Sequence, residues 1–166
     1  TRENIYNTVS VLFLLMIMGM EGCEEKEQIK TILPITNLSE QIIGFFEETL
    51  PTTAESNCFF VSEEGDIHYL INSIEELQAI YSCNNELPEI DFASYSIIVG
   101  QKRMPNSYYS VLEQNIKETE ILDLNILVQL PSDGHWPAFS NMYYWGVYPK
   151  LPNKKINVNI INREQL

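Results

Sequence analysis

The chain has 166 residues, 45% of them hydrophobic, with 10 basic against 23 acidic side chains and a net charge of −13. This length is enough for one domain with a core and a further N-terminal segment. The charge disfavours binding to nucleic-acid phosphates, and it would repel an anionic membrane surface. Any membrane attachment must therefore be covalent or apolar. The simplest explanation for most of this negative charge is that it keeps the protein soluble.

The first 22 residues predict a signal peptide. Residues 9–20, VSVLFLLMIMGM, are almost wholly apolar. As a helix they would reach only about 18 Å, well short of the roughly 30 Å hydrocarbon core of a bilayer. A short apolar stretch that follows a basic residue, here Arg2, is typical of a secretory signal.

The residues Met20-Glu21-Gly22-Cys23 resemble the cleavage motif of bacterial lipoprotein signals. This resemblance implies cleavage before Cys23, acylation of Cys23 with palmitate among the chains, and anchoring in the bacterial outer membrane. Two or three acyl chains suffice for stable attachment. The acidic run EEKE at 24–27 resembles an export tag for the cell surface, and periplasmic display stays open. The alternative is a soluble secreted protein with an incidental cysteine.

The other two cysteines predict a disulfide. Secretion would place the chain in an oxidising compartment, and with Cys23 lipidated, Cys58 and Cys83 remain as a pair. A bridge between them would stabilise the fold by roughly 3.5 kcal/mol in the chain-entropy model. Two buried free thiols are the alternative. The spacing fits no zinc motif.

The N-terminal part after the signal predicts a tether followed by a helix. Residues 24–37 are mostly polar and contain Pro34. Residues 37–51, NLSEQIIGFFEETLP, predict a short helix with Ser39 as N-cap and Pro51 as its end. Its predicted apolar face consists of Ile42, Ile43, Phe46 and Leu50.

The remaining chain predicts mostly strands. Residues 58–72 predict a hairpin that turns at Glu64-Gly65-Asp66, and residues 73–82 a helix with a capping box of Ser73 and Glu76. Strands are predicted at 95–101, 142–149 and 155–161, with an antiparallel pair at 108–116 and 118–130. The predicted class is α+β, with a predominantly antiparallel β-sheet of six to seven strands, one packed short helix and an N-terminal helix.

The predicted organisation has four parts. Residues 1–22 are the signal peptide, 23–56 the lipid-anchored tether with its short helix, 57–162 the α+β domain, and 163–166 a tail.

Residues 73–162 carry motifs in an order that resembles a known family. The motifs are SIEELQAIY, then PEIDFASYSIIVGQ, then PNSYYSV, and at the end YWGVYPK. They are similar to the C-terminal domain family named for the protease-complex subunit PrcB, and to secreted lipoproteins that carry it. The resemblance implies a noncatalytic, protein-associating domain without a cofactor, and it carries over no active-site residues.

Catalytic chemistry has little support in the sequence. The chain has two histidines, His68 in a predicted strand and His135 in a loop, and it lacks a nucleophile elbow and a phosphate-binding glycine loop. SEEGD at 62–66 lacks the ligand spacing of a calcium loop and predicts a solvated turn. We expect no enzyme activity, metal or cofactor.

Aromatic side chains in the C-terminal half are the candidate binding residues. Exposed Trp and Tyr anchor protein interfaces and stack on sugar rings. The predicted function is noncovalent binding of an unidentified envelope or extracellular protein. The alternative is a glycan-binding accessory lipoprotein, and a loop that folds back could instead bury the aromatic residues. The candidates are Trp136, Phe139, Tyr143, Tyr144 and Trp145.

Overall fold

The computed structural model describes residues 29–50, 58–59, 65–106, 109–130 and 139–163. In these ranges the chain forms two helices and seven strands, and the strands are arranged in two sheets. One sheet has the strand order β1-β4-β5-β7 and the other the order β2-β3-β6. The elements are β1 (Lys30–Ile32), α2 (Glu40–Thr49), β2 (Ile67–Ile71), α3 (Ile74–Ile80), β3 (Tyr95–Met104), β4 (Ser110–Glu118), β5 (Leu122–Gln129), β6 (Ser140–Pro149) and β7 (Ile156–Asn162).

The predicted α+β class with mainly antiparallel strands is confirmed. All strand pairs are antiparallel except β5 and β7, which run parallel. The predicted antiparallel pair is β4 with β5, and Asn115 lies opposite Asn125 in its register. The strands divide between two sheets, which the sequence did not predict.

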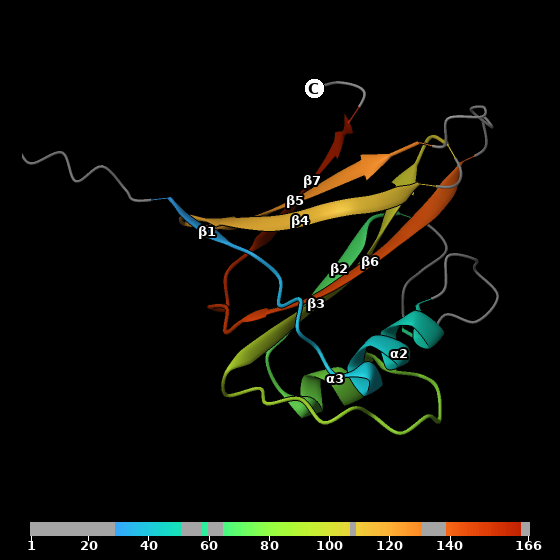
Figure 1. Cartoon of the computed structure of the whole chain (residues 1–166), viewed down its shortest axis with the longest axis vertical. Coiled ribbons are helices and arrows are strands. Elements are labelled where there is room, and N and C mark those ends of the chain that lie inside the picture. Colours follow the sequence, from blue (N-terminus) through green and yellow to red (C-terminus); the bar gives the residue numbers. More distant parts are fainter. Residues whose placement is uncertain (1–28, 51–57, 60–64, 107–108, 131–138, 164–166) are drawn as a thin grey trace, which may run out of the picture.

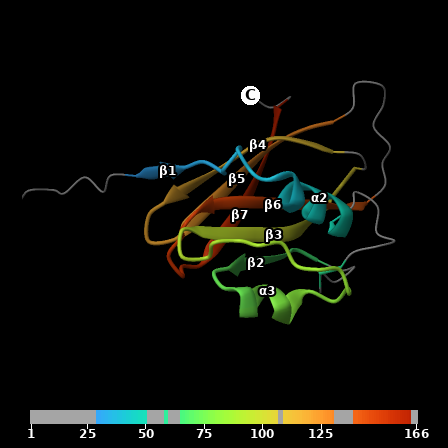
Figure 2. The same cartoon turned by 60° about the horizontal axis from the view of Figure 1, so that its bottom comes forward.

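The molecule has three layers. The two sheets pack face to face, and α2 and α3 lie on the far side of the three-stranded sheet (Figures 1 and 2). The core between the sheets contains Ile116, Leu124 and Ile126 from the four-stranded sheet, and Ile98 and Tyr148 from the three-stranded sheet. A second core lies between the three-stranded sheet and the helices, with Phe46, Leu77, Ile97, Val99 and Val147 among its residues.

Both helices begin as their sequences predict. The Ser39 side chain accepts a hydrogen bond from Ile42 N, and the Ser73 side chain accepts one from Glu76 N at 3.2 Å. The Glu76 carboxylate accepts from the backbone of Asn72, one residue before the cap, at 2.5 Å. Both N-termini are therefore satisfied by local side chains.

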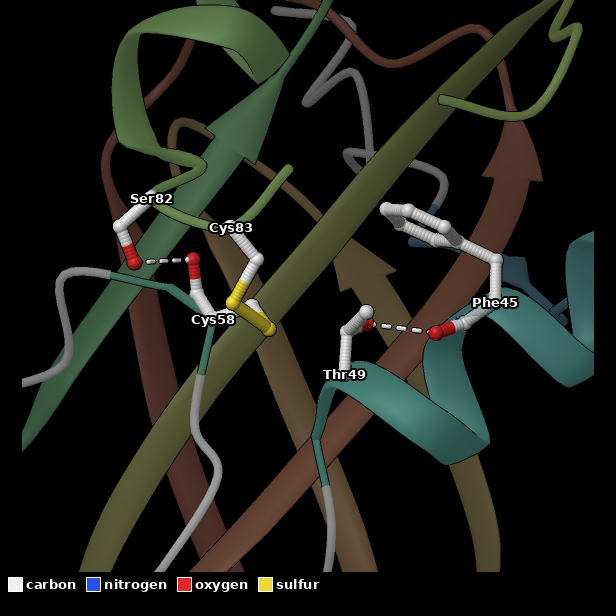
Figure 3. Close-up of a disulfide and its surroundings, with 5 residues drawn as sticks. All are labelled: Phe45, Thr49, Cys58, Ser82 and Cys83. Atoms are coloured by element: carbon white, nitrogen blue, oxygen red, sulfur yellow. Dashed lines mark hydrogen bonds between the residues drawn. A yellow bond between two sulfur atoms is a disulfide. The ribbon is translucent and has the colours of Figure 1, made fainter. Parts of the chain in front are cut away.

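The disulfide between Cys58 and Cys83 is confirmed, with a Cα–Cα distance of 5.1 Å. It joins the segment after α2 to the segment after α3 (Figure 3). Cys58 N donates to Thr49 O, and Cys58 O accepts from the backbone and the hydroxyl of Ser82. The bridge therefore links the C-terminal ends of the two helices rather than a helix and a long strand.

The predicted hairpin at 58–72 is wrong in its described part. Phe59 forms an isolated antiparallel bridge with Tyr81, and β2 pairs with β3. The reason is the contact network of Cys58, which holds this segment between the two helix ends. Residues 60–64, which include Glu64 of the predicted turn, lie outside the described ranges.

The predicted tether is partly integrated into the fold. Residues 30–32 form β1, and Ile32 is buried in the core between the sheets. Ile35 N donates to Val147 O at 2.7 Å, so the chain then crosses to the edge of β6. Apolar residues within the mostly polar stretch explain why it packs against both sheets.

The outer face of the four-stranded sheet is polar. Asn115, Asn125 and Asn159 lie in register on three adjacent strands. Their amides are joined by hydrogen bonds of 3.2 Å, from Asn125 to Asn115 and from Asn159 to Asn125. Asn157 donates to Asp123 at 2.9 Å beside them. This face therefore satisfies its polar groups among its own side chains.

Candidate binding surface

The predicted aromatic candidates do not form one surface. Trp136 lies outside the described residues. Phe139 is 73% exposed, and the Arg103 guanidinium lies 5.4 Å from its ring centroid. Tyr144 is only 3% exposed and points into the core between the sheets. Tyr144 therefore cannot contact a partner in this structure, and the prediction of Tyr144 as a binding residue is wrong.

Tyr143 and Trp145 lie on the opposite face of β6 from Tyr144 and pack against the core beneath the helices. The Trp145 ring stacks on Phe46 of α2 with centroids 4.6 Å apart. Both side chains are only partly buried. Because α2 covers Trp145, of the described candidates only Phe139 is fully available to a partner.

No group of histidine, cysteine and acidic side chains suitable for a metal ion occurs in the described ranges. Burial raises the pKa values of the Tyr144 and Tyr148 hydroxyls well above their ordinary range, so both stay protonated. Burial also lowers the pKa of His68, and the nearby charge of Asp66 opposes this effect.

Asp66 instead has a structural role. Burial disfavours its charged form, but hydrogen bonds from the Lys102 side chain and from Arg103 N outweigh it, so the pKa of Asp66 is lowered. These contacts hold the start of β2 against the end of β3. His135 lies outside the described residues.

Three of the exposed apolar side chains in the described ranges lie together in a groove beside β4. Leu33 is 64% exposed, Leu112 39% and Val111 36%. The groove has a volume of about 570 Å³, and we call it the β4 groove. Its lining consists of Leu33, Pro34, Thr36, Val111, Leu112, Glu113, Gln114 and Asn115. One wall is the segment between β1 and α2, and the other is the first half of β4.

The walls of the β4 groove are held in place by hydrogen bonds to β6. The Gln114 side chain donates to Trp145 O at 3.0 Å and accepts from the Tyr148 hydroxyl at 3.1 Å. The opposite wall is fixed by the bond from Ile35 N to Val147 O. A groove whose walls are already ordered loses less conformational entropy when a partner binds.

Sequence reasoning missed the residues of this groove, although one signal was present. Val111 and Leu112 are adjacent apolar residues in a strand whose side chains should alternate. The register of β4 with β5 shifts between Val111 and Glu113, which marks a β-bulge. A bulge allows both apolar side chains to reach the groove. For Leu33 the only signal is an apolar residue directly before Pro34.

Comparisons with family models, with curated proteins and with solved structures found no match to this chain. The resemblance to the PrcB C-terminal domain family therefore stays a prediction. No helix within the described ranges is long and apolar enough to cross a bilayer. Cys23 and the predicted signal peptide lie outside those ranges.

Proposed function

We propose that this chain is a noncatalytic lipoprotein of the bacterial outer membrane, anchored through Cys23, that binds another envelope or extracellular protein through the β4 groove. The observation that carries the proposal is the clustering of exposed Leu33, Val111 and Leu112 on ordered walls. Contiguous apolar patches rimmed by polar residues typically mark interaction sites. The resemblance to a protein-associating domain family supports the same class of function.

The binding claim is tested by capture from an envelope extract on the immobilised full chain. The variant Leu112→Lys places a charge in the groove, and Ile29→Lys is its matched control, since Ile29 is 61% exposed and outside the groove lining. We expect a protein enriched by the parent and by Ile29→Lys and lost with Leu112→Lys. Equal enrichment by all three would exclude the groove as the contact surface. Enrichment by none would exclude protein binding.

The anchoring claim has its own test. Metabolic labelling with a palmitate analogue should label the parent chain and leave Cys23→Ser unlabelled. Fractionation should then move the variant out of the outer-membrane fraction, since the lipid would be the anchor. Labelling that survives Cys23→Ser would contradict this assignment.

Glycan binding is the second candidate function, and one observation favours it. The Phe139 side chain is largely exposed, and the Arg103 guanidinium lies over its ring, 5.4 Å from the ring centroid. An aromatic ring with a polar neighbour can stack on a sugar. Oligosaccharide binding on a glycan array that is lost in Phe139→Ala would favour this function over protein binding.

A further inference from the structure

The β4 groove contains a strand edge that β1 leaves uncovered. β1 pairs with β4 at three positions, where Lys30, Thr31 and Ile32 lie opposite Glu118, Lys117 and Ile116. After Ile32 the chain turns away through Leu33 and Pro34, and proline has no N–H to offer a neighbouring strand. In the part of the chain that the structure describes, no strand faces the β4 edge before Ile116.

The direction of the backbone groups follows from the pairing on the other side. Leu122 N donates to Lys155 O at 2.9 Å, beside β7. Consecutive residues of a strand direct their N–H and C=O to opposite edges, so Asp123 and Asn125 direct theirs to β4. Lys117 and Asn115 are the residues opposite them, and they bond to β5.

The same alternation places the backbone groups of Ile116 and Gln114 at the other edge of β4. Ile116 lies opposite Ile32 of β1. Gln114 lies two residues before Ile116, in the lining of the β4 groove, and no described strand lies opposite it on this edge. An unpaired strand edge is a template on which an extended segment can add by main-chain hydrogen bonds.

Charge narrows the choice of segment. Among the described residues that line the groove, Glu113 is the only ionisable one, and the chain carries a net charge of −13. Lys30 and Lys154 both form ion pairs with Glu118, which lies at the end of β4 that β1 covers. A second copy of this chain would bring the same negative charge to the edge, so a positively charged partner is favoured over self-association.

We infer that the partner of this protein presents an extended, basic segment that adds as a strand to β4, in line with β1. This inference rests on the proposed protein-binding function and specifies how the partner is held. Gln114 supplies the backbone donor and acceptor, Val111, Leu112 and Leu33 contact the apolar side chains of the segment, and Glu113 attracts its basic side chains.

The test follows backbone amide exchange by NMR in the full chain, with an end-blocked peptide that alternates lysine and valine as the probe. Adding the peptide should slow exchange of the Gln114 amide by about tenfold or more, because that N–H would pass from solvent to a ladder hydrogen bond. The Asn115 amide, which already faces β5, is the internal control and should change little. No protection of Gln114 would overturn the inference.

Two peptide controls separate the parts of the inference. The same peptide with N-methylated valines cannot complete the ladder and should give no protection, and equal protection would exclude strand addition. A peptide that alternates glutamate and valine should bind more weakly. Equal binding of the acidic peptide would overturn the claim that the segment is basic.

Self-association is tested without any peptide. Protection of the Gln114 amide that rises with protein concentration alone would show a second copy of the chain at the edge of β4, and would also overturn the inference.

Variants connect the probe to the groove. Leu112→Lys should abolish protection of Gln114, and Ile29→Lys should preserve it; the opposite pattern would overturn the inference. Groove-dependent capture of an envelope protein, without any protection by the basic peptide, would leave protein binding standing and remove strand addition. Peptide protection without capture would support the strand edge and count against the proposed function.

Discussion

The two sheets of this protein contrast in what covers them. The three-stranded sheet is buried on both faces, with Tyr148 in the core between the sheets and Val147 beneath the helices. The four-stranded sheet buries Leu124 and Ile126 on one face and leaves its asparagine ladder on the other. The difference shows that an alternating strand makes a one-sided sheet, whereas a continuous apolar run requires a second covering layer.

The largest effect expected from this contrast concerns the covering helix. Phe46→Ala should lower the free energy of unfolding by about 3–5 kcal/mol, because the ring is fully buried and stacks on Trp145. Leu127→Ala, on the open face of the other sheet, should cost less than about 1 kcal/mol. Urea denaturation followed by circular dichroism measures both. Similar losses would contradict the one-sided character of the four-stranded sheet.

The disulfide should have the next largest effect, since it ties the covering helices together. Replacing both Cys58 and Cys83 with serine should lower stability by up to about 3.5 kcal/mol. Ser82→Ala removes only the side-chain bond to Cys58 O at 2.8 Å and should cost about 1 kcal/mol. Thermal unfolding with and without reductant compares them. A reductant-insensitive midpoint would mean that the helical layer does not need the bridge.

A smaller effect should follow from the close packing within the three-stranded sheet. A Cβ at Gly100 would lie 2.3 Å from the Tyr144 hydroxyl and 2.8 Å from Ile67 O, so Gly100→Ala should cost about 1–3 kcal/mol. Gly44→Ala is the control, because nothing lies within 4 Å of its added Cβ and alanine favours the helix. Gly44→Ala should raise the unfolding midpoint, and a rise for Gly100→Ala would contradict this packing.

The open sheet face should respond less. Asn125→Ala removes the central amide of the ladder, with its bonds to Asn115 and Asn159. The half-exposed groups can bond to water instead, so we expect a loss of about 1 kcal/mol or less. Chemical denaturation measures it. A loss as large as that of Phe46→Ala would show that the ladder matters as much as a core.

The smallest effect should be a pH dependence from the edge of the three-stranded sheet. The pKa of His68 is lowered by burial below its ordinary value of 6.5. Below that pH the unfolded chain binds a proton that the folded chain resists, so stability should fall as pH drops through 6.5 toward the folded-state pKa. Denaturation curves of the parent and of His68→Gln compare the slopes. An equal slope in both would exclude His68 as the cause.

Local patterns were sufficient for the helices and most strands. The predictions of the Ser39 and Ser73 caps and of the alternation through 122–130 depend on neighbouring residues. The prediction of the cysteine pair outside the predicted lipoprotein cleavage motif depends on simple counting. The structure bears them out because short-range hydrogen bonds and the side-chain period need no information about distant parts of the chain.

The candidate surface was less accessible to such reasoning. The sequence singled out aromatic residues by type, but Tyr144 and Trp145 are adjacent in β6 and point to opposite faces, one into the inter-sheet core and one under α2. Which aromatic side chains are covered depends on where a helix from residues 40–49 packs. That placement is a long-range contact, which residue type cannot predict.

The sequence by itself therefore indicated the α+β class and the N-terminal caps of both helices, and it favoured a bridge between Cys58 and Cys83 over two free thiols, because these follow from local chemistry and a small number of choices. Only the tertiary structure decided that the strands form two sheets, that β7 lies parallel to β5, and that β1 leaves β4 halfway along. The β4 groove results from that departure. It exists because two segments far apart in the chain meet at one end of a strand and separate at the other.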